Sequence, residues 1–321
     1  MNYPGYKNQP ICYNSFFLFH VFLLINISCG FSQAFRNQQN IYFISDFQAP
    51  LPMETIISKP YRNEEARDSL FADIIRQQPQ TLFMLGDLTS MGSDAKAWVP
   101  LDTFLNSLNK ISTSVYAIPG NHEYIGKSTG MRMFKQRFPE QWLYGYFVSL
   151  DSIAIVMLNS NFNELGRNEF SRQLTWYKSV MDSLDSVPDI QAIIVCIHHP
   201  PYSNSKVVGS SKPVSDLIVP IFEKTQKALL FISGHSHNLE YFADSIGKHF
   251  LVIGGGGGMA QPLIPMNKRI YVDLLNQETK PLYFYLVIEK NGNRLKLIAK
   301  GFKKDFTFFE SYIDTITINE H

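Results

Sequence analysis

From residue 41 onward, short apolar runs alternate with longer amphipathic segments. The short runs predict strands and the amphipathic segments predict helices, because a buried strand needs four to eight apolar residues and a surface helix needs an apolar stripe of period 3.6. In the first part of the chain the order is strand, helix, strand, helix, strand, at residues 41–45, 63–77, 81–85, 94–108 and 114–118. This βαβαβ order is typical of a parallel sheet covered by helices.

The second part of the chain continues this alternation and then changes character. We expect a hairpin, a helix and three further strands, at residues 146–150 with 153–158, at about 169–184, and at 191–197, 228–233 and 249–253. The last runs resemble antiparallel strands, at residues 282–289, 294–300 and 313–318. No repeat or linker is visible in the sequence, so residues 35–321 are predicted to form a single α/β domain.

The first 34 residues are predicted to be an export signal. Residues 16–27 form an apolar run that is too short to span a bilayer as a helix but fits the core of a signal peptide. Two processing sites compete, namely cleavage after Ala34 and lipidation of Cys29 in a sequence that resembles the end of a bacterial lipobox. Simple export is preferred because Asn26 fits the lipobox poorly. The alternative to export is a wrongly assigned start codon or an N-terminal segment that is buried in the fold. If the source is bacterial, we expect a periplasmic, outer-membrane-associated or secreted protein.

Charge and cysteine content narrow the possible functions. Apart from Lys7, the only charged residue among the first 34, the chain carries 28 basic and 28 acidic residues. This neutral balance argues against binding to nucleic acid or to a membrane surface through a polybasic segment. Only Cys196 of the three cysteines lies in the body of the chain, within an apolar run where a buried, inert thiol is expected.

Polar residues of similar chemistry follow five of the predicted strands. They are Asp46 with Gln48, Asp87, Asn121 with His122, His198 with His199, and His235 with His237. All stand at carboxyl ends of strands, the edge where open α/β sheets place their ligand sites. Gly234 is expected to let the backbone turn sharply before the last pair. Singly, each residue could be a helix cap or a turn residue, but the ordered set predicts a site for Mn, Fe or Zn.

Five motifs in this set resemble those of the calcineurin-like metallophosphoesterases in order and in their position at strand ends. The motifs are Asp46-Phe47-Gln48, Gly86-Asp87, Gly120-Asn121-His122-Glu123, His198-His199-Pro200-Pro201 and Gly234-His235-Ser236-His237. The resemblance covers roughly residues 41–260 and implies a four-layer α/β/β/α sandwich, with two mixed sheets flanked by helices. The downstream half is closest to small purple-acid-phosphatase-like enzymes, in residues 200–204, 237–241 and 254–258.

The resemblance also implies a dinuclear centre of two divalent or mixed-valence ions, both bridged by Asp87. It assigns Asp46 and His237 to the first ion, and it assigns the second ion to Asn121, His198 and His235. His198 is preferred over His199 because the ligand histidine of the family usually stands two residues before proline. His199 would then contact the ligands or the substrate, although the reverse assignment stays open.

Two neighbouring residues are expected to assist the chemistry. His122 would stabilise developing charge or protonate the leaving oxygen. Glu123 would orient His122. The expected reaction is the attack of a metal-bound hydroxide on a small phosphoester.

Two positions depart from the family pattern. Gln48 stands where the family usually has histidine, so it either coordinates weakly through its carbonyl or holds a water molecule. Ser90 stands three residues after Asp87, where purple acid phosphatases have tyrosine, so an Fe(III)-tyrosinate site is not expected.

The predicted function is that of an exported phosphatase that hydrolyses phosphomonoesters. The alternatives are a phosphodiesterase acting on nucleotides or phospholipid headgroups, and a catalytically weak binding protein of the cell envelope, which Gln48 favours. Tyr202 is a candidate wall of the substrate cleft. The glycine run 254–258, with Gly256 at its centre, either faces the phosphate with its amides or serves only as a connector.

Overall fold

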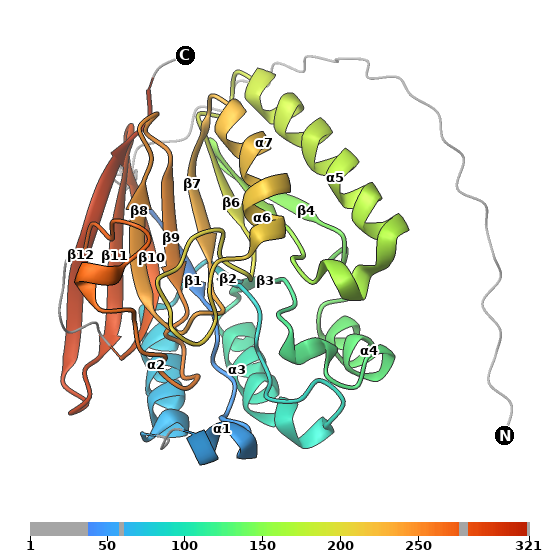
Figure 1. Ribbon diagram of the computed structural model, residues 1–321, viewed down its shortest axis with the longest axis vertical. Helices are drawn as coiled ribbons and strands as arrows, with labels where there is room; N and C mark the ends of the chain where they lie inside the picture. Colours follow the sequence, from blue (N-terminus) through green and yellow to red (C-terminus); the bar gives the residue numbers. More distant parts are fainter. Residues whose placement is uncertain (1–37, 58–60, 276–281, 320–321) are drawn as a thin grey trace, which may run out of the picture. The chain divides into compact units, whose positions relative to one another are not determined.

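The computed structural model describes residues 38–57, 61–275 and 282–319, which form two six-stranded mixed sheets with helices on their outer faces (Figure 1). The first sheet has the order β12-β11-β10-β1-β2-β3. Its strands are β1 (Gln38–Ile44), β2 (Thr81–Met84), β3 (Ser114–Ala117), β10 (Tyr283–Asn291), β11 (Arg294–Phe302) and β12 (Phe308–Thr317). The predicted export signal and Cys29 lie outside the described residues.

The second sheet has the order β4-β5-β6-β7-β9-β8. Its strands are β4 (Tyr146–Leu150), β5 (Ile153–Met157), β6 (Ala192–Cys196), β7 (Ala228–Ser233), β8 (Leu239–Ala243) and β9 (His249–Ile253). Strands β5, β6, β7 and β9 pair in parallel, as β1, β2 and β3 do in the first sheet. Each sheet therefore gathers the carboxyl ends of its parallel strands at one edge.

Three apolar clusters separate four layers. The central cluster joins the facing sides of the two sheets, for example Phe43 of β1 and Ile194 of β6, both fully buried. The outer face of the first sheet is covered by α2 (Asn63–Gln77) and α3 (Val99–Lys110). Helices α5 (Phe162–Ser186), α6 (Lys212–Leu217) and α7 (Val219–Lys224) cover the second sheet. The predicted α/β/β/α sandwich is confirmed.

The predicted elements agree with the structure wherever the apolar period is strong, and α2 has the predicted bounds. Other elements are absent from the prediction, namely α1 (Pro52–Ile57), α4 (Ser128–Arg137), α6, α7 and strand β8. Helix α5 begins at Phe162 rather than near residue 169, because the non-helical backbone of Gly166, with φ of 75°, separates its first turn from the rest. No helix in the described ranges has the length and apolar character needed to cross a membrane.

Candidate metal centre

The polar residues predicted at strand ends come together where the carboxyl ends of the parallel strands meet. Hydrogen bonds between backbone groups tie their loops to one another. Asp46 N donates to Gly86 O at 3.1 Å, and Phe47 N donates to Asp87 O at 3.2 Å. In the second sheet, Gly234 N donates to His198 O at 2.9 Å. The ligand loops are therefore fixed by the ends of the sheets.

A first group of possible ligands consists of Asp46, Asp87 and His237, which are all buried and each bring one ligand atom within 4.8 Å of the others. His237 Nε2 lies 3.3 Å from Asp46 Oδ1. His237 Nδ1 donates to the Met259 carbonyl at 2.6 Å, so its Nε2 is the free nitrogen. The Met259 carbonyl thus fixes the tautomer that a metal ligand needs.

A second group consists of His198, His199 and His235, whose ligand atoms also lie within 4.8 Å of one another. His198 Nδ1 donates to the Leu85 carbonyl at 2.8 Å, which leaves Nε2 to face the centre. His198 Nε2 lies 3.3 Å from Asn121 Oδ1 and 3.4 Å from Asp87 Oδ2. Asp87 therefore belongs to the first group and also faces the second, which is the position that a bridging carboxylate requires.

The electrostatics of the centre are dominated by this carboxylate. Burial opposes charge on Asp87, but the neighbouring His198 and His122 hold its pKa well below the usual range. Burial likewise opposes charge on His198, yet Asp87 raises its pKa to about 9. The carboxylates thus create a strongly negative potential that the histidines partly neutralise, and such a site favours bound cations.

Comparison with known families identifies this arrangement. The model of the calcineurin-like phosphoesterase domain matches residues 39–239, which contain all five motifs. The chain belongs to the calcineurin-like phosphoesterase family. Members of this family are metallophosphoesterases, hydrolases that typically bind two metal ions. A search of curated proteins finds no significant match.

Solved structures with a similar fold include two phosphatases and one membrane-complex anchor. A purple acid phosphatase from yellow lupin (Lupinus luteus) is 14% identical with a TM-score of 0.63, over 88% of this chain and 54% of the lupin chain. GAP50 of Plasmodium, described as the anchor in the inner membrane complex, is 14% identical with a TM-score of 0.60, over 88% and 90%. A dimetal phosphatase from Danio rerio is 16% identical with a TM-score of 0.56, over 88% and 99%. This chain thus spans about half the length of the lupin enzyme, and at these identities the likeness concerns the fold.

The residues that are present fit two metal ions in this calcineurin-like phosphoesterase. Carboxylates, imidazoles and one amide form the donor set, as Mn, Fe or Zn require. Gln48 supplies a further sign, because its Oε1 is buried without a partner among the described residues. Its Nε2 donates to Asp87 Oδ2 at 3.3 Å and lies 3.2 Å from His237 Nε2. The Gln48 side chain thus occupies the place that the sequence assigned to it, beside the first group.

His122 and Glu123 follow the ligand Asn121 in the short helical turn His122–Tyr124. His122 Nδ1 donates to the Ser90 carbonyl at 2.8 Å, and its Nε2 lies 3.8 Å from Asp87 Oδ2. Burial opposes charge on His122, but Asp87 raises its pKa. The Nε2 atom is therefore the one that faces the centre.

The contacts of Glu123 do not match the role that the sequence predicted for it, which was to orient His122. Rather than orienting His122 directly, its carboxylate accepts hydrogen bonds from the backbone amides of four residues, namely Asp87 (2.9 Å), Leu88 (2.7 Å), Thr89 (3.2 Å) and Gly120 (2.6 Å). Burial, with a contribution from the Asp87 carboxylate, raises the pKa of Glu123 to about 7. Glu123 thus joins the loop of the bridging ligand to the loop of Asn121.

His199 is held beside the second group by a residue that the sequence did not indicate. Ser160 Oγ accepts from the His199 backbone N at 2.9 Å and lies 2.7 Å from its Nδ1. The His199 and His235 rings are 4.3 Å apart. Burial and the neighbouring His198 lower the pKa of His199 to about 3. His199 is therefore neutral at physiological pH, and its assignment as a ligand or a substrate contact stays open.

The contacts of the surrounding loops exclude one of the two roles considered for Gly256 and correct the role predicted for Tyr202. The Gly256 amide donates to the Ser45 carbonyl at 2.9 Å, so it is not available to a phosphate oxygen. The Tyr202 ring packs against Phe250 and Tyr271, with centroids 4.9 and 5.1 Å away, and belongs to the packing beneath its loop. Gly234 is required by close approach, because a Cβ there would lie 2.1 Å from Ser45 Oγ.

Proposed function

We propose that this chain is a metal-dependent phosphatase that hydrolyses phosphomonoesters. The observation that carries the proposal is the position of Asp87, whose carboxylate belongs to the Asp46–His237 group and lies 3.4 Å from His198 of the other group. Asp46, Asp87 and His237 would hold one ion, and Asp87, Asn121, His198 and His235 would hold the other. Two bound ions would neutralise the charge of the phosphoester oxygens and lower the pKa of the attacking water.

The chain's own residues would orient the substrate and move the proton. His122 Nε2 faces the centre while its Nδ1 is held by the Ser90 carbonyl, so Nε2 can carry a proton to the leaving oxygen. Asp87 favours the protonated form of this imidazole, because its carboxylate raises the His122 pKa against the effect of burial. His122 is therefore the expected general acid of the reaction.

The test is hydrolysis of 4-nitrophenyl phosphate after removal of metals with a chelator and addition of Mn, Zn or Fe. Turnover should depend on added metal and should be abolished in Asp87→Ala, while the exposed Asp305→Ala serves as the matched control. His122→Asn should lower kcat by about 10²- to 10⁴-fold with metal content unchanged. Metal-independent turnover, or full activity of Asp87→Ala, would contradict the proposal.

A phosphodiesterase is the second candidate, and one feature favours it. A cavity of about 540 Å³ is lined by His237 together with Asn238, Gln261 and Leu263, directly beside the first group. A diester carries an organic group on each side of phosphorus, so a cavity at this ligand has room for the second group. Faster hydrolysis of bis(4-nitrophenyl) phosphate than of the monoester would favour this candidate.

A binding protein with little turnover is the candidate of another class. Gln48 favours it, because an amide is a weaker ligand than an imidazole and the first ion would be held less tightly. Two bound ions measured by elemental analysis, without turnover of either ester, would support this candidate.

Export is proposed from the sequence of residues 1–34 alone. Fractionation of cells that express the full chain, together with a Cys29→Ala variant, tests it. Loss of membrane association in the variant indicates lipidation, and an unprocessed cytoplasmic product contradicts export.

A further inference from the structure

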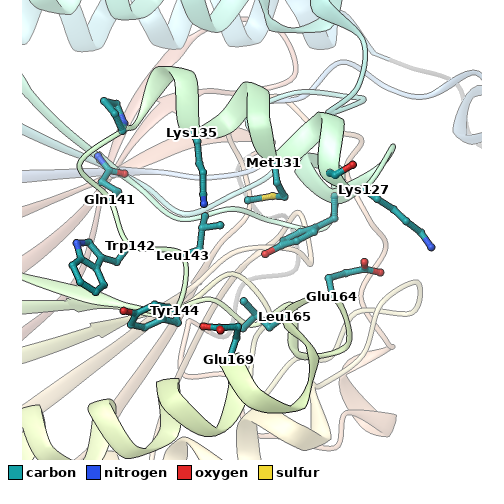
Figure 2. Close-up of a pocket in the computed structure, with 13 residues that line it drawn as sticks. Lys127, Met131, Lys135, Gln141, Trp142, Leu143, Tyr144, Glu164, Leu165 and Glu169 are labelled. Atoms are coloured by element: carbon teal, nitrogen blue, oxygen red, sulfur yellow. The ribbon is translucent and has the colours of Figure 1, made fainter. Parts of the chain in front are cut away.

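A cavity of about 770 Å³ lies between α4 and the first turns of α5 (Figure 2). Most of its wall is aromatic or aliphatic, and the side chains concerned are Tyr124, Met131, Trp142, Leu143, Tyr144 and Leu165. Its volume is within the range of sites that enclose small organic ligands, roughly 300–1,000 Å³. The cavity therefore has room for a group much larger than a phosphate.

Tyr124 of the cavity wall is connected to the candidate metal centre in two ways, along the chain and through a hydrogen bond. Tyr124 follows His122 by two residues, so their Cα atoms lie within about 7 Å of each other. The Tyr124 hydroxyl accepts a hydrogen bond from Asn159 Nδ2 at 2.8 Å. The next residue, Ser160, accepts from the backbone of His199 at 2.9 Å. A single short loop thus contacts the cavity wall on one side and the second ligand group on the other.

The wall offers a surface for a flat ring. Trp142 is 62% exposed, and its ring meets that of Tyr144 edge to face, with centroids 5.3 Å apart and an interplanar angle of 89°. An exposed indole supported by a second aromatic ring is suited to stacking with a ligand. Figure 2 shows Lys135 extending from α4 into the space between the helices, with Glu169 on α5 across from it. Charges of both signs at the rim can bond to the donors and acceptors of a heterocycle.

We propose that this cavity receives the organic group of the phosphoester and that this group is aromatic and larger than a phenyl ring. The proposal rests on the phosphatase function above, in which His122 protonates the leaving oxygen. The leaving group must then lie beside His122, and Tyr124 of the cavity wall belongs to the same short helical turn as His122. A nucleoside and a naphthyl group share the required chemistry.

The test compares KM values for a nucleoside 5′-monophosphate, 1-naphthyl phosphate and glycerol 3-phosphate. Leu165→Trp fills the cavity and Trp142→Ala removes the stacking surface, while Leu217→Trp, on α6 and 41% exposed, is the matched control. Both cavity variants should raise KM for the aromatic esters about tenfold and leave KM for glycerol 3-phosphate within about twofold. An increase in KM for the nucleotide alone identifies a nucleoside site. An equal increase in KM for the naphthyl ester identifies a general aromatic site.

Equal KM changes for the aromatic and aliphatic esters, or none, would overturn the proposal. Trp142→Ala keeps the proposal testable if Leu165→Trp does not fold, because the exposed Trp142 side chain contributes little to the core. If the wild-type chain hydrolyses none of the esters with any metal, the phosphatase function fails, and binding is measured instead. Saturable binding of 1-naphthyl phosphate in titration calorimetry that is lost in Trp142→Ala and in Leu165→Trp would then support the cavity as a site, and no binding to the wild type would refute it.

Discussion

Replacing Glu123 by glutamine tests how far the metal centre depends on one buried carboxylate. Oε1 accepts from Leu88 N and Thr89 N, and Oε2 accepts from Asp87 N and Gly120 N. In Glu123→Gln one of these oxygens becomes an NH₂ group. Whichever way the new amide is turned, two backbone N–H groups lose their acceptor and face another donor.

The magnitude follows from these bonds. Each buried donor left unpaired costs about 1–3 kcal/mol, so two of them cost about 2–6 kcal/mol. Removal of a buried charge offsets part of this loss, which leaves a net destabilisation of about 3 kcal/mol. For a domain of this size class, that corresponds to a decrease in Tm of about 6–12 °C. Because Asp87 and Gly120 lie in ligand loops, the variant should also bind metal about 10- to 100-fold more weakly.

The assay is thermal unfolding of the metal-free chain at pH 8, where Glu123 is ionised because its pKa is about 7. Metal affinity is measured separately by competition with a coloured chelator. Glu64→Gln, at an exposed position in the first turn of α2, is the matched control and should change stability by less than about 0.5 kcal/mol. A Tm within about 2 °C of the wild type, with unchanged metal affinity, would refute the role assigned to Glu123.

Three further outcomes are expected. Gln48→His should increase the affinity of the weaker metal site about tenfold in chelator competition. The control Gln77→His, on the surface of α2, should leave the affinity unchanged. An unchanged affinity in Gln48→His would show that position 48 lies outside the coordination sphere. Chelation should lower Tm, because each site contributes about 2.7 kcal/mol when the metal is at 100 times its Kd, and an unchanged Tm would mean that metal does not bind the folded chain. Gly234→Ala should destabilise the chain by about 1–3 kcal/mol, since the new Cβ would lie 2.1 Å from Ser45 Oγ. The control Gly209→Ala should be tolerated, because its Cβ would have no atom within 4 Å. Equal Tm values for the two variants would contradict this prediction.

The sequence predicts the central elements of the fold because their burial is reflected in their composition. Strands β5, β6 and β7 are fully buried along their length and are correspondingly continuous apolar runs. Helix α4 lacks such a signal, because it contains Gly130 and buries only three of its residues. The first turn of α5 could not be predicted for a different reason, since Gly166, with a positive φ, interrupts the apolar periodicity that would identify the turn.

The gathering of the candidate ligands at one place could be predicted because the carboxyl ends of neighbouring parallel strands lie side by side. The groups that orient the ligands could not be predicted. The carbonyls of Leu85 and Met259 fix the tautomers of His198 and His237, but every residue has a carbonyl, so the sequence carries no trace of this role. Ser160 has no local motif either, since it approaches His199 only through the pairing of β5 with β6.

Four of the candidate ligands have a backbone conformation that is unfavourable for any residue other than glycine. Asp46, Asp87, His235 and His237 have φ angles of 59°, 53°, 66° and 41°, a left-handed conformation that glycine would adopt without strain. Each such residue lowers the free energy of unfolding by on the order of 1 kcal/mol. The four together therefore amount to an appreciable part of a typical free energy of unfolding of about 5–15 kcal/mol. Glycine would relieve the strain but would remove the carboxylate or the imidazole. Each of these residues lies in a loop, two to four residues beyond the end of the preceding strand. Hydrogen bonds from neighbouring loops maintain the left-handed conformation, as in the donation from His235 N to Asp46 Oδ2 at 2.9 Å. Strain at four candidate ligands therefore argues that the arrangement is maintained for the chemistry of the site rather than for the stability of the fold.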